Sequence, residues 1–264
     1  MRPDLKARIA AMPAVLGLVG DVPRPGGGFE EDARLGFPSM FHFVRSRLGE
    51  AVVLLGTAAG LESSSDDAGQ GTGLLLLRPA MLATARNWWV VEPIALKDPA
   101  ATPTGRARQR IGRAYGVLAQ ESRMGARAMQ NASRHGGNRL FEQISERLVE
   151  QADGIEVKAV QHGSSSVPPP RDTELVTGLA RGIDDYYGTV DAGADLQLFW
   201  HAASSLSHAE RWYRALAASD AGRAFAQTLE ERSFDAVCSG INVLGQTILG
   251  IQYGLPRAVD LATS

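Results

Sequence analysis

Apolar residues recur at alternating spacings of three and four along most of the chain, a rhythm that keeps one stripe of an α-helix towards a core. The pattern is strongest near the C-terminus, where it runs from Val237 to Leu255. Gly254 and Pro256 end it, and both residue types are typical stop signals for helices. The sequence therefore predicts a long helix here, and its continuous apolar stripe predicts a position in the middle of the fold.

The same rhythm predicts further helices along the chain, and with the N-terminal segment counted we expect an all-α bundle of about seven or eight helices. A short alternating segment at Ile155, Val157 and Val160 leaves a strand open as the less favoured alternative. The remaining predicted helices span 41–59, 74–88, 111–129, 140–151, 175–186 and 196–213.

Glycine, proline and serine mark the expected connections. Residues 163–171 are rich in Ser and Pro, and such a segment favours an extended linker that resists packing. Residues 23–31, with three consecutive glycines, and residues 62–73, rich in Ser, Asp and Gly, are expected to be mobile loops. We expect residues 1–40 to form a partly flexible N-terminal segment and residues 41–264 to form a single helical bundle domain.

Composition is that of a globular protein. Hydrophobic residues make up 44% and charged residues 21% of the 264 positions. Because 27 Lys and Arg face 29 Asp and Glu, the chain lacks an overall positive field, and we do not expect it to bind nucleic acid. The single cysteine, Cys238, excludes an intrachain disulfide and a cysteine zinc site, and its apolar surroundings predict a buried small side chain.

Two segments resemble membrane-directed sequences. Residues 1–20 place basic residues before an apolar run, but Pro13 interrupts the run and no typical cleavage site follows. Residues 236–255 are uncharged and form the one transmembrane candidate, yet polar residues such as Asn242 and Gln246 are costly in lipid. We therefore expect a cytoplasmic protein without a membrane span.

The sequence predicts no metal and no cofactor. The glycines at 26–28 lack the Lys-Ser/Thr ending of a P-loop. Asp184 and Asp191 faintly resemble the magnesium-binding aspartates of helical terpene cyclases, but their spacing departs from that pattern and favours an exposed acidic helix end. His201 and His208 lie seven positions apart, about 10.5 Å along a helix, too far to share one metal ion.

One pair of residues has the types required for catalysis. Ser204 and His208 are four positions apart, so they can touch on one helical face. A serine beside a histidine suggests a nucleophile and a base, with Glu121 or Tyr186 as a further partner. The third orienting group and a nucleophile elbow are absent, so a structural hydrogen bond is favoured.

Aromatic and basic residues suggest two other kinds of site. Trp88, Trp200 and Tyr186 are candidates to line a ligand pocket, although aromatics at helical spacing are more often core residues. The arginines of residues 106–113 form the densest basic run, and with His208 they leave RNA binding or cleavage open. Their spacing spreads the charge around a helix, which favours a solvated helix start.

The segments Leu76–Pro93, with Arg78, Trp88 and Trp89, and Trp200–His208 resemble a family of uncharacterised helical proteins of high-GC Gram-positive bacteria, and more distantly the HEPN superfamily of helical bundles. The similarity covers roughly residues 74–255. In HEPN ribonucleases four to six residues separate an Arg from the catalytic His that follows it, whereas His201, Ala202 and Ala203 occupy the corresponding positions before His208. The resemblance implies a helical bundle that pairs into dimers.

Our leading hypothesis is a non-catalytic helical module that acts by protein or ligand binding and forms a homodimer, because the helical pattern is coherent and no catalytic set is complete. The alternative is an enzyme with a pocket between helices. It would use His208 as general acid or base, with Ser204 and Glu121 as partners. The third alternative is a degenerate HEPN-like protein that binds or cleaves RNA.

Overall fold

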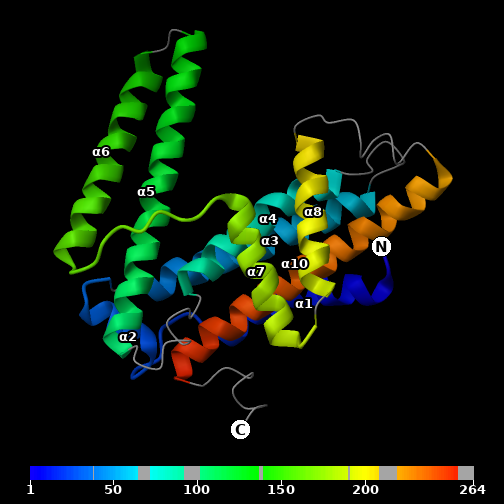
Figure 1. Cartoon of the computed structure of the whole chain (residues 1–264), viewed down its shortest axis with the longest axis horizontal. Coiled ribbons are helices and arrows are strands. Elements are labelled where there is room, and N and C mark those ends of the chain that lie inside the picture. The colour runs from blue at the N-terminus through cyan, green and yellow to red at the C-terminus, as the bar shows by residue number, and fades with distance from the viewer. Residues whose placement is uncertain are drawn as a thin grey trace. The chain divides into compact units, whose positions relative to one another are not determined.

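The computed structural model describes residues 1–37, 39–64, 72–91, 102–136, 139–189, 191–207 and 219–254. These residues form nine helices and no strand, so the all-α prediction is confirmed (Figure 1). The helices are α1 (Pro3–Val19), α2 (Gly28–Arg34), α3 (Met40–Ser64), α4 (Thr72–Val91), α5 (Pro103–Gly136), α6 (Arg139–Gln161), α7 (Asp172–Tyr187), α8 (Asp191–Ser207) and α10 (Asp220–Tyr253).

The structure differs from the sequence-based expectation at the N-terminal segment and at residues 155–160. The N-terminal forty residues contribute two helices, α1 and α2, and α2 begins inside the loop predicted at 23–31. The strand considered at Ile155–Val160 is wrong, because α6 continues through it to Gln161. The loop predicted at 62–73 lies largely outside the described residues.

The chain divides into two compact units, not into a flexible segment and a single bundle. The first unit comprises residues 1–23, 42–91 and 171–264, and the second comprises residues 24–41 and 92–170. Helical periodicity shows that a segment will bury one face, but it does not show which partner covers that face. We predicted a division at residue 41. That prediction did not anticipate that α1 packs against α10, the C-terminal helix.

In the first unit, α10 is the central helix, as its apolar stripe predicted. It packs against α1, α4, α7 and α8, and Val237, Ile241, Leu244 and Ile248 are buried. Among the described residues, α10 alone is long and apolar enough to cross a membrane, and 61% of its most apolar 18-residue window is buried inside the protein.

Polar residues of α10 have partners within the first unit. Gln252 Nε2 donates to the carbonyl of Val19 at 2.6 Å, and Asn242 Nδ2 donates to the hydroxyl of Tyr187 at 2.9 Å. A buried amide with a hydrogen-bond partner costs far less than an unsatisfied one. These contacts explain how a mostly buried helix accommodates polar side chains.

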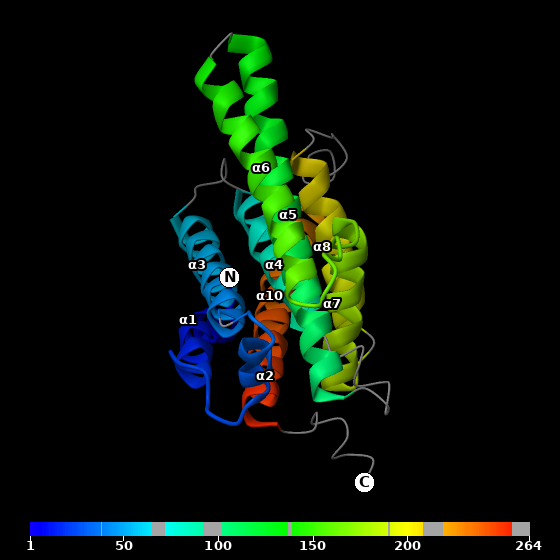
Figure 2. The ribbon, with the colours of Figure 1, turned by 90° about the vertical axis from the view of Figure 1, so that its left-hand side faces the viewer.

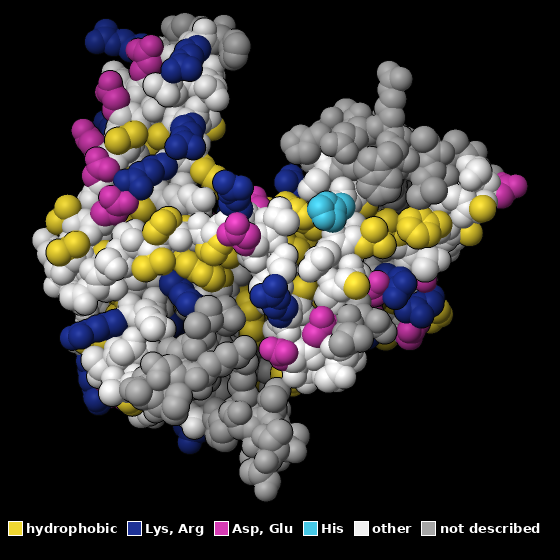
Figure 3. All heavy atoms as spheres, viewed as in Figure 1, with side chains coloured by type: hydrophobic (Ala, Val, Ile, Leu, Met, Phe, Trp, Pro, Cys, Tyr) yellow, Lys and Arg dark blue, Asp and Glu magenta, His cyan; other side chains and the backbone are white. Residues whose placement is uncertain are grey.

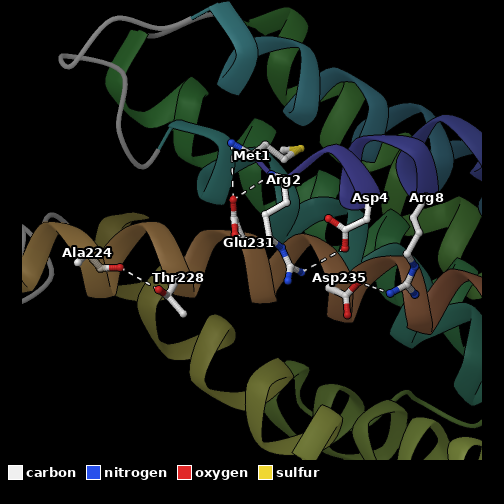
Figure 4. A network of polar contacts seen from close by, with 8 residues as sticks. All are labelled: Met1, Arg2, Asp4, Arg8, Ala224, Thr228, Glu231 and Asp235. Atoms are coloured by element: carbon white, nitrogen blue, oxygen red, sulfur yellow. Dashed lines mark hydrogen bonds and ion pairs between the residues drawn. The ribbon is translucent and has the colours of Figure 1, made fainter.

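Ion pairs fasten α1 to α10 (Figure 4). Arg2 Nε lies 3.3 Å from Glu231 Oε2, and the guanidinium of Arg8 pairs with Asp235. Arg8 also donates to Ser239 Oγ at 3.2 Å, one turn further along α10. Because these side chains are partly exposed, each pair contributes little energy and mainly fixes the register of the two helices.

In the second unit, α5 and α6 lie side by side as an antiparallel hairpin, which both views show (Figures 1 and 2). α2 packs against the first turns of α5. The segment after α6, predicted to be an unpacked linker, instead lies against α5. Val167 N donates to the carbonyl of Gly112 at 2.9 Å, and Ser164 Oγ donates to the carbonyl of Arg108 at 3.0 Å.

Candidate functional site

The predicted catalytic residues lie on different parts of the chain. His208 lies outside the described residues, so its pairing with Ser204 is not described. Ser204 is half-buried on α8 in the first unit, whereas Glu121 is half-buried on α5 in the second unit. Within the described residues no group of three His, Cys, Asp or Glu side chains is arranged to hold a metal ion.

The two tryptophans proposed to line a pocket are core residues. Trp88 and Trp200 are 3% and 6% exposed. Gly182 of α7 makes room for the Trp88 ring, because a Cβ there would overlap its Cζ2 atom. Trp200 Nε1 donates to Thr173 Oγ1 at 3.3 Å, and the guanidinium of Arg78 stacks 4.6 Å from the Trp200 ring centre. Both rings therefore pack α4 and α8 onto α7.

Tyr186, the third pocket candidate, lies near the opposite end of α7 from Thr173, about 20 Å away along the helix axis. It is half-buried and makes an edge contact with Tyr187 at 4.9 Å between ring centroids. Burial raises the pKa of the Tyr186 phenol, and the neighbouring Tyr187 raises it further. Tyr186 thus marks a different part of α7 from the one that holds Trp200.

Asp184, which faintly resembles a magnesium-binding aspartate in the sequence, caps the next helix. Its Oδ1 accepts a hydrogen bond from Gly193 N at 3.0 Å, in the first turn of α8. The first turn of a helix leaves backbone N–H groups without partners, and a carboxylate there satisfies one of them. The side chain of Asp191 is not among those described. The acidic helix end therefore has a structural role at Asp184.

The basic run on α5 is neutralised at its centre. Arg110 is buried and forms a bidentate ion pair with Asp32 of α2. Its Nε lies 3.2 Å from Oδ2, and its Nη2 lies 3.0 Å from Oδ1. Arg110 Nη2 also donates to the carbonyl of Gly28 at 3.1 Å. Burial raises the pKa of Asp32 to about 6, against the lowering effect of the guanidinium. Arg110 lies in the basic run on which the RNA-binding alternative depends. In the structure it holds α2 against α5.

A tyrosine–histidine contact that the sequence reasoning missed joins α5 to the end of α6. The Tyr115 hydroxyl lies 2.7 Å from His162 Nδ1, and the ring of Phe37 makes an edge contact with Tyr115 at 4.9 Å. Burial raises the pKa of Tyr115, which disfavours the phenolate that a basic catalyst would need. The contact is therefore better explained as a structural one that holds the end of α6 against α5.

The two hairpin helices meet through small residues. Ala152 and Ala159 are the buried residues of α6, and Ser145 Oγ donates to the carbonyl of Ala126 on α5 at 3.0 Å. Gly125 of α5 lies beneath Leu148, where a Cβ would come within 3.2 Å of Leu148 Cδ1. Small residues bring two helices close together but bury little apolar surface.

The apolar stripe that predicted α6 lies along one edge of this small-residue seam and is only partly buried there. Leu140 is 56% exposed, and Ile144, Leu148 and Ile155 are partly exposed. At 100° per residue these four positions share one side of α6. Leu118 and Met129 are partly exposed on the adjoining side of α5. We call Leu118, Met129, Leu140, Ile144, Leu148 and Ile155 the hairpin apolar face.

The opposite side of the hairpin is charged. Arg123 Nη1 of α5 lies 2.8 Å from Glu156 Oε1, and Arg123 Nη2 lies 3.6 Å from Asp153 Oδ1. In the surface view, acidic side chains gather along α6 and basic ones towards α5 (Figure 3). This side of α6 also carries the exposed Val149, Val157 and Val160. We take the hairpin apolar face as the candidate functional surface.

The lone thiol is not a reactive centre. Cys238 is fully buried in α10, and burial raises its pKa to about 12. Since the thiolate is the nucleophile, we expect the native protein to react with a disulfide reagent at pH 8 far more slowly than the urea-unfolded chain. A colorimetric thiol titration in both states measures this. Equal rates would show that Cys238 is accessible in the native fold.

No family model, no curated protein and no solved structure matches the chain.

Proposed function

We propose that this protein is a non-catalytic helical module that acts by binding a protein chain through the hairpin apolar face, and that the chain bound there is a second copy, giving a homodimer. The carrying observation is the stripe formed by the exposed Leu140 and the partly exposed Ile144, Leu148 and Ile155 on a helix whose buried residues are alanines. Contiguous exposed apolar side chains on a folded helix are typical of interaction sites.

The size of the surface supports self-association. α6 has 23 residues and is about 34 Å long. Two packed helices are about 20 Å wide, so one side of the hairpin offers about 700 Å². A standard interface buries about 800 Å² on each partner. A second hairpin placed on this face therefore has roughly the required area, and a two-fold arrangement uses the same face of both copies.

Replacing Ile144 with serine should raise the dimer dissociation constant at least thirtyfold, because one buried isoleucine side chain contributes about 2 kcal/mol and each copy loses one. The control is Val157→Ser, since Val157 is 55% exposed on the same helix but outside the apolar face. Sedimentation equilibrium of both variants and the parent measures the constants. A parent chain that stays monomeric at high concentration, or a dimer equally stable in Ile144→Ser, would refute the proposal.

A further inference from the structure

We infer that the first unit binds a phosphate group between Arg78 of α4 and Thr173 of α7, beside the Trp200 ring. Both side chains contact Trp200 of α8, one over the face of the ring and the other at its indole nitrogen. The inference does not depend on the proposed dimer, because these three residues lie in the compact unit that does not contain the hairpin.

Arg78 is the residue that carries this inference. Its side chain is half-buried, and its Nε is sealed from solvent without a hydrogen-bond partner. Among the described residues no carboxylate forms an ion pair with Arg78, whereas Arg86 on the same helix pairs with Asp172 at 3.1 Å. Stacking on an aromatic ring offsets only part of the cost of removing a guanidinium from water. A bound anion would supply the missing counter-charge.

Stacking orders the guanidinium of Arg78 in a way that suits an oxyanion. All N–H donors of a guanidinium lie in its plane, so packing one flat face on Trp200 leaves the edge with the terminal nitrogens to receive acceptors. This edge matches the paired oxygens of a phosphate or a carboxylate. Because the stack already orders the side chain, less conformational entropy is lost when an anion binds.

Thr173 supplies a second donor. Trp200 Nε1 donates to Thr173 Oγ1 at 3.3 Å, so the threonine hydroxyl accepts that bond and retains its own proton for another acceptor. Thr173 is exposed in the first turn of α7, where a small ligand can reach it. Glu174 follows Thr173 and lies about 100° further around the helix, which sets its carboxylate away from the threonine hydroxyl.

The separation of the two donors favours a phosphate over a carboxylate. Arg78 Cζ lies 4.6 Å from the Trp200 ring centre and Thr173 Oγ1 lies 3.3 Å beyond the indole nitrogen, so Cζ and Oγ1 are about 7 Å apart. A carboxylate with both oxygens on the guanidinium has none on its far side for a second donor. A tetrahedral phosphate has oxygens on opposite sides and spans this distance with hydrogen bonds of about 2.8 Å at each end.

Stabilisation by phosphate tests the site. About 50 mM inorganic phosphate should raise the Tm of the parent by about 4 °C relative to acetate at equal ionic strength, as expected when the dissociation constant is about tenfold below that concentration. Melts followed by tryptophan fluorescence report on the first unit, because all four tryptophans fall within its residue ranges.

Variants assign the effect to the two donors. Arg78→Met should abolish the phosphate-dependent shift, since methionine still packs on Trp200 but carries no charge. Thr173→Val should reduce the shift, and Thr173→Ser, which keeps the hydroxyl, should retain it. Arg181→Met is the matched control, because Arg181 is exposed about 12 Å further along α7 and should leave the shift unchanged. Each variant is compared with and without phosphate, so its own effect on stability does not enter the result.

A parent without a phosphate-dependent shift, or an equal shift in Arg78→Met, overturns the site, and an equal shift in acetate overturns its assignment to phosphate. If Arg78→Met does not fold, the exposed Thr173 provides the same test, and equal shifts in Thr173→Val and Thr173→Ser overturn the site. A parallel titration with glycerol 3-phosphate distinguishes the sources of the group. Stronger stabilisation by the ester supports a phosphorylated small molecule as the ligand, and weaker stabilisation supports free phosphate.

Discussion

Replacing Asp32 with alanine should lower the free energy of unfolding of the second unit by about 3 to 5 kcal/mol at neutral pH. Arg110 is 8% exposed and Asp32 is fully buried, so the substitution leaves a buried guanidinium without its counter-charge. Removing one partner of a buried pair costs much more than replacing both partners with apolar groups. The double variant Asp32→Leu with Arg110→Met should therefore recover most of the loss. Urea denaturation of the parent, Asp32→Leu, Arg110→Met and the double variant gives the coupling energy.

The same pair should give the parent a pH dependence of defined sign. The pKa of Asp32 is raised to about 6 by burial, above its ordinary value of 3.8. A group with a raised folded pKa contributes stability that is present below the ordinary value and is lost as pH rises through the folded value. The parent should thus lose stability between about pH 4 and pH 6, a change that the double variant lacks. If the parent gained stability between pH 4 and pH 6, and gained more than the double variant, the raised pKa of Asp32 would be contradicted.

Helical class was predictable from the sequence because the three–four rhythm of apolar residues is a local property of each segment. The central position of α10 followed from its continuous apolar stripe, and the burial of Val237 and Ile248 confirms it. Which helices pair was not predictable. The periodicity is recognised from large apolar residues, and the small residues of the α5–α6 seam, such as Ala152 and Ala159, add little to it. For α6 the larger apolar side chains therefore lie along the edge of the seam, whereas the buried residues are alanines.

The same distinction between local patterns and distant contacts applies to the candidate site residues. The interpretation of Trp88 and Trp200 as core residues depended on residue type and spacing, and the structure confirms that both are buried. Asp32 and Tyr115 were missed because their partners, Arg110 and His162, lie 78 and 47 positions away, and a single sequence contains no pattern that links such distant residues. The proposed interaction face depends on side-chain exposure, which a single sequence does not give.

The segment that follows α6 was predicted to resist packing, and the glycines beneath it explain why it does not. Gly112 and Gly116 lie one turn apart on α5, and neither has a side chain to hold off the extended segment around Val167. A Cβ at Gly112 would lie 2.5 Å from the carbonyl oxygen of Ser165, and one at Gly116 would overlap the carbonyl oxygen of Val167. Both atoms belong to the backbone, so a change of side-chain rotamer cannot relieve either overlap.

Replacing Gly116 with alanine should therefore destabilise the second unit by about 3 kcal/mol, the upper end of the cost of overpacking, because the segment must move away from α5. The hydrogen bond from Val167 N to the Gly112 carbonyl would be lost with it. Gly154→Ala on α6 is the matched control, since a Cβ there meets nothing within 4 Å. That substitution should stabilise the hairpin by about 0.5 to 1 kcal/mol, the usual gain when alanine replaces glycine inside a helix. Urea denaturation of both variants compares them. A Gly116→Ala protein as stable as Gly154→Ala would mean that the segment does not rest on α5 in solution.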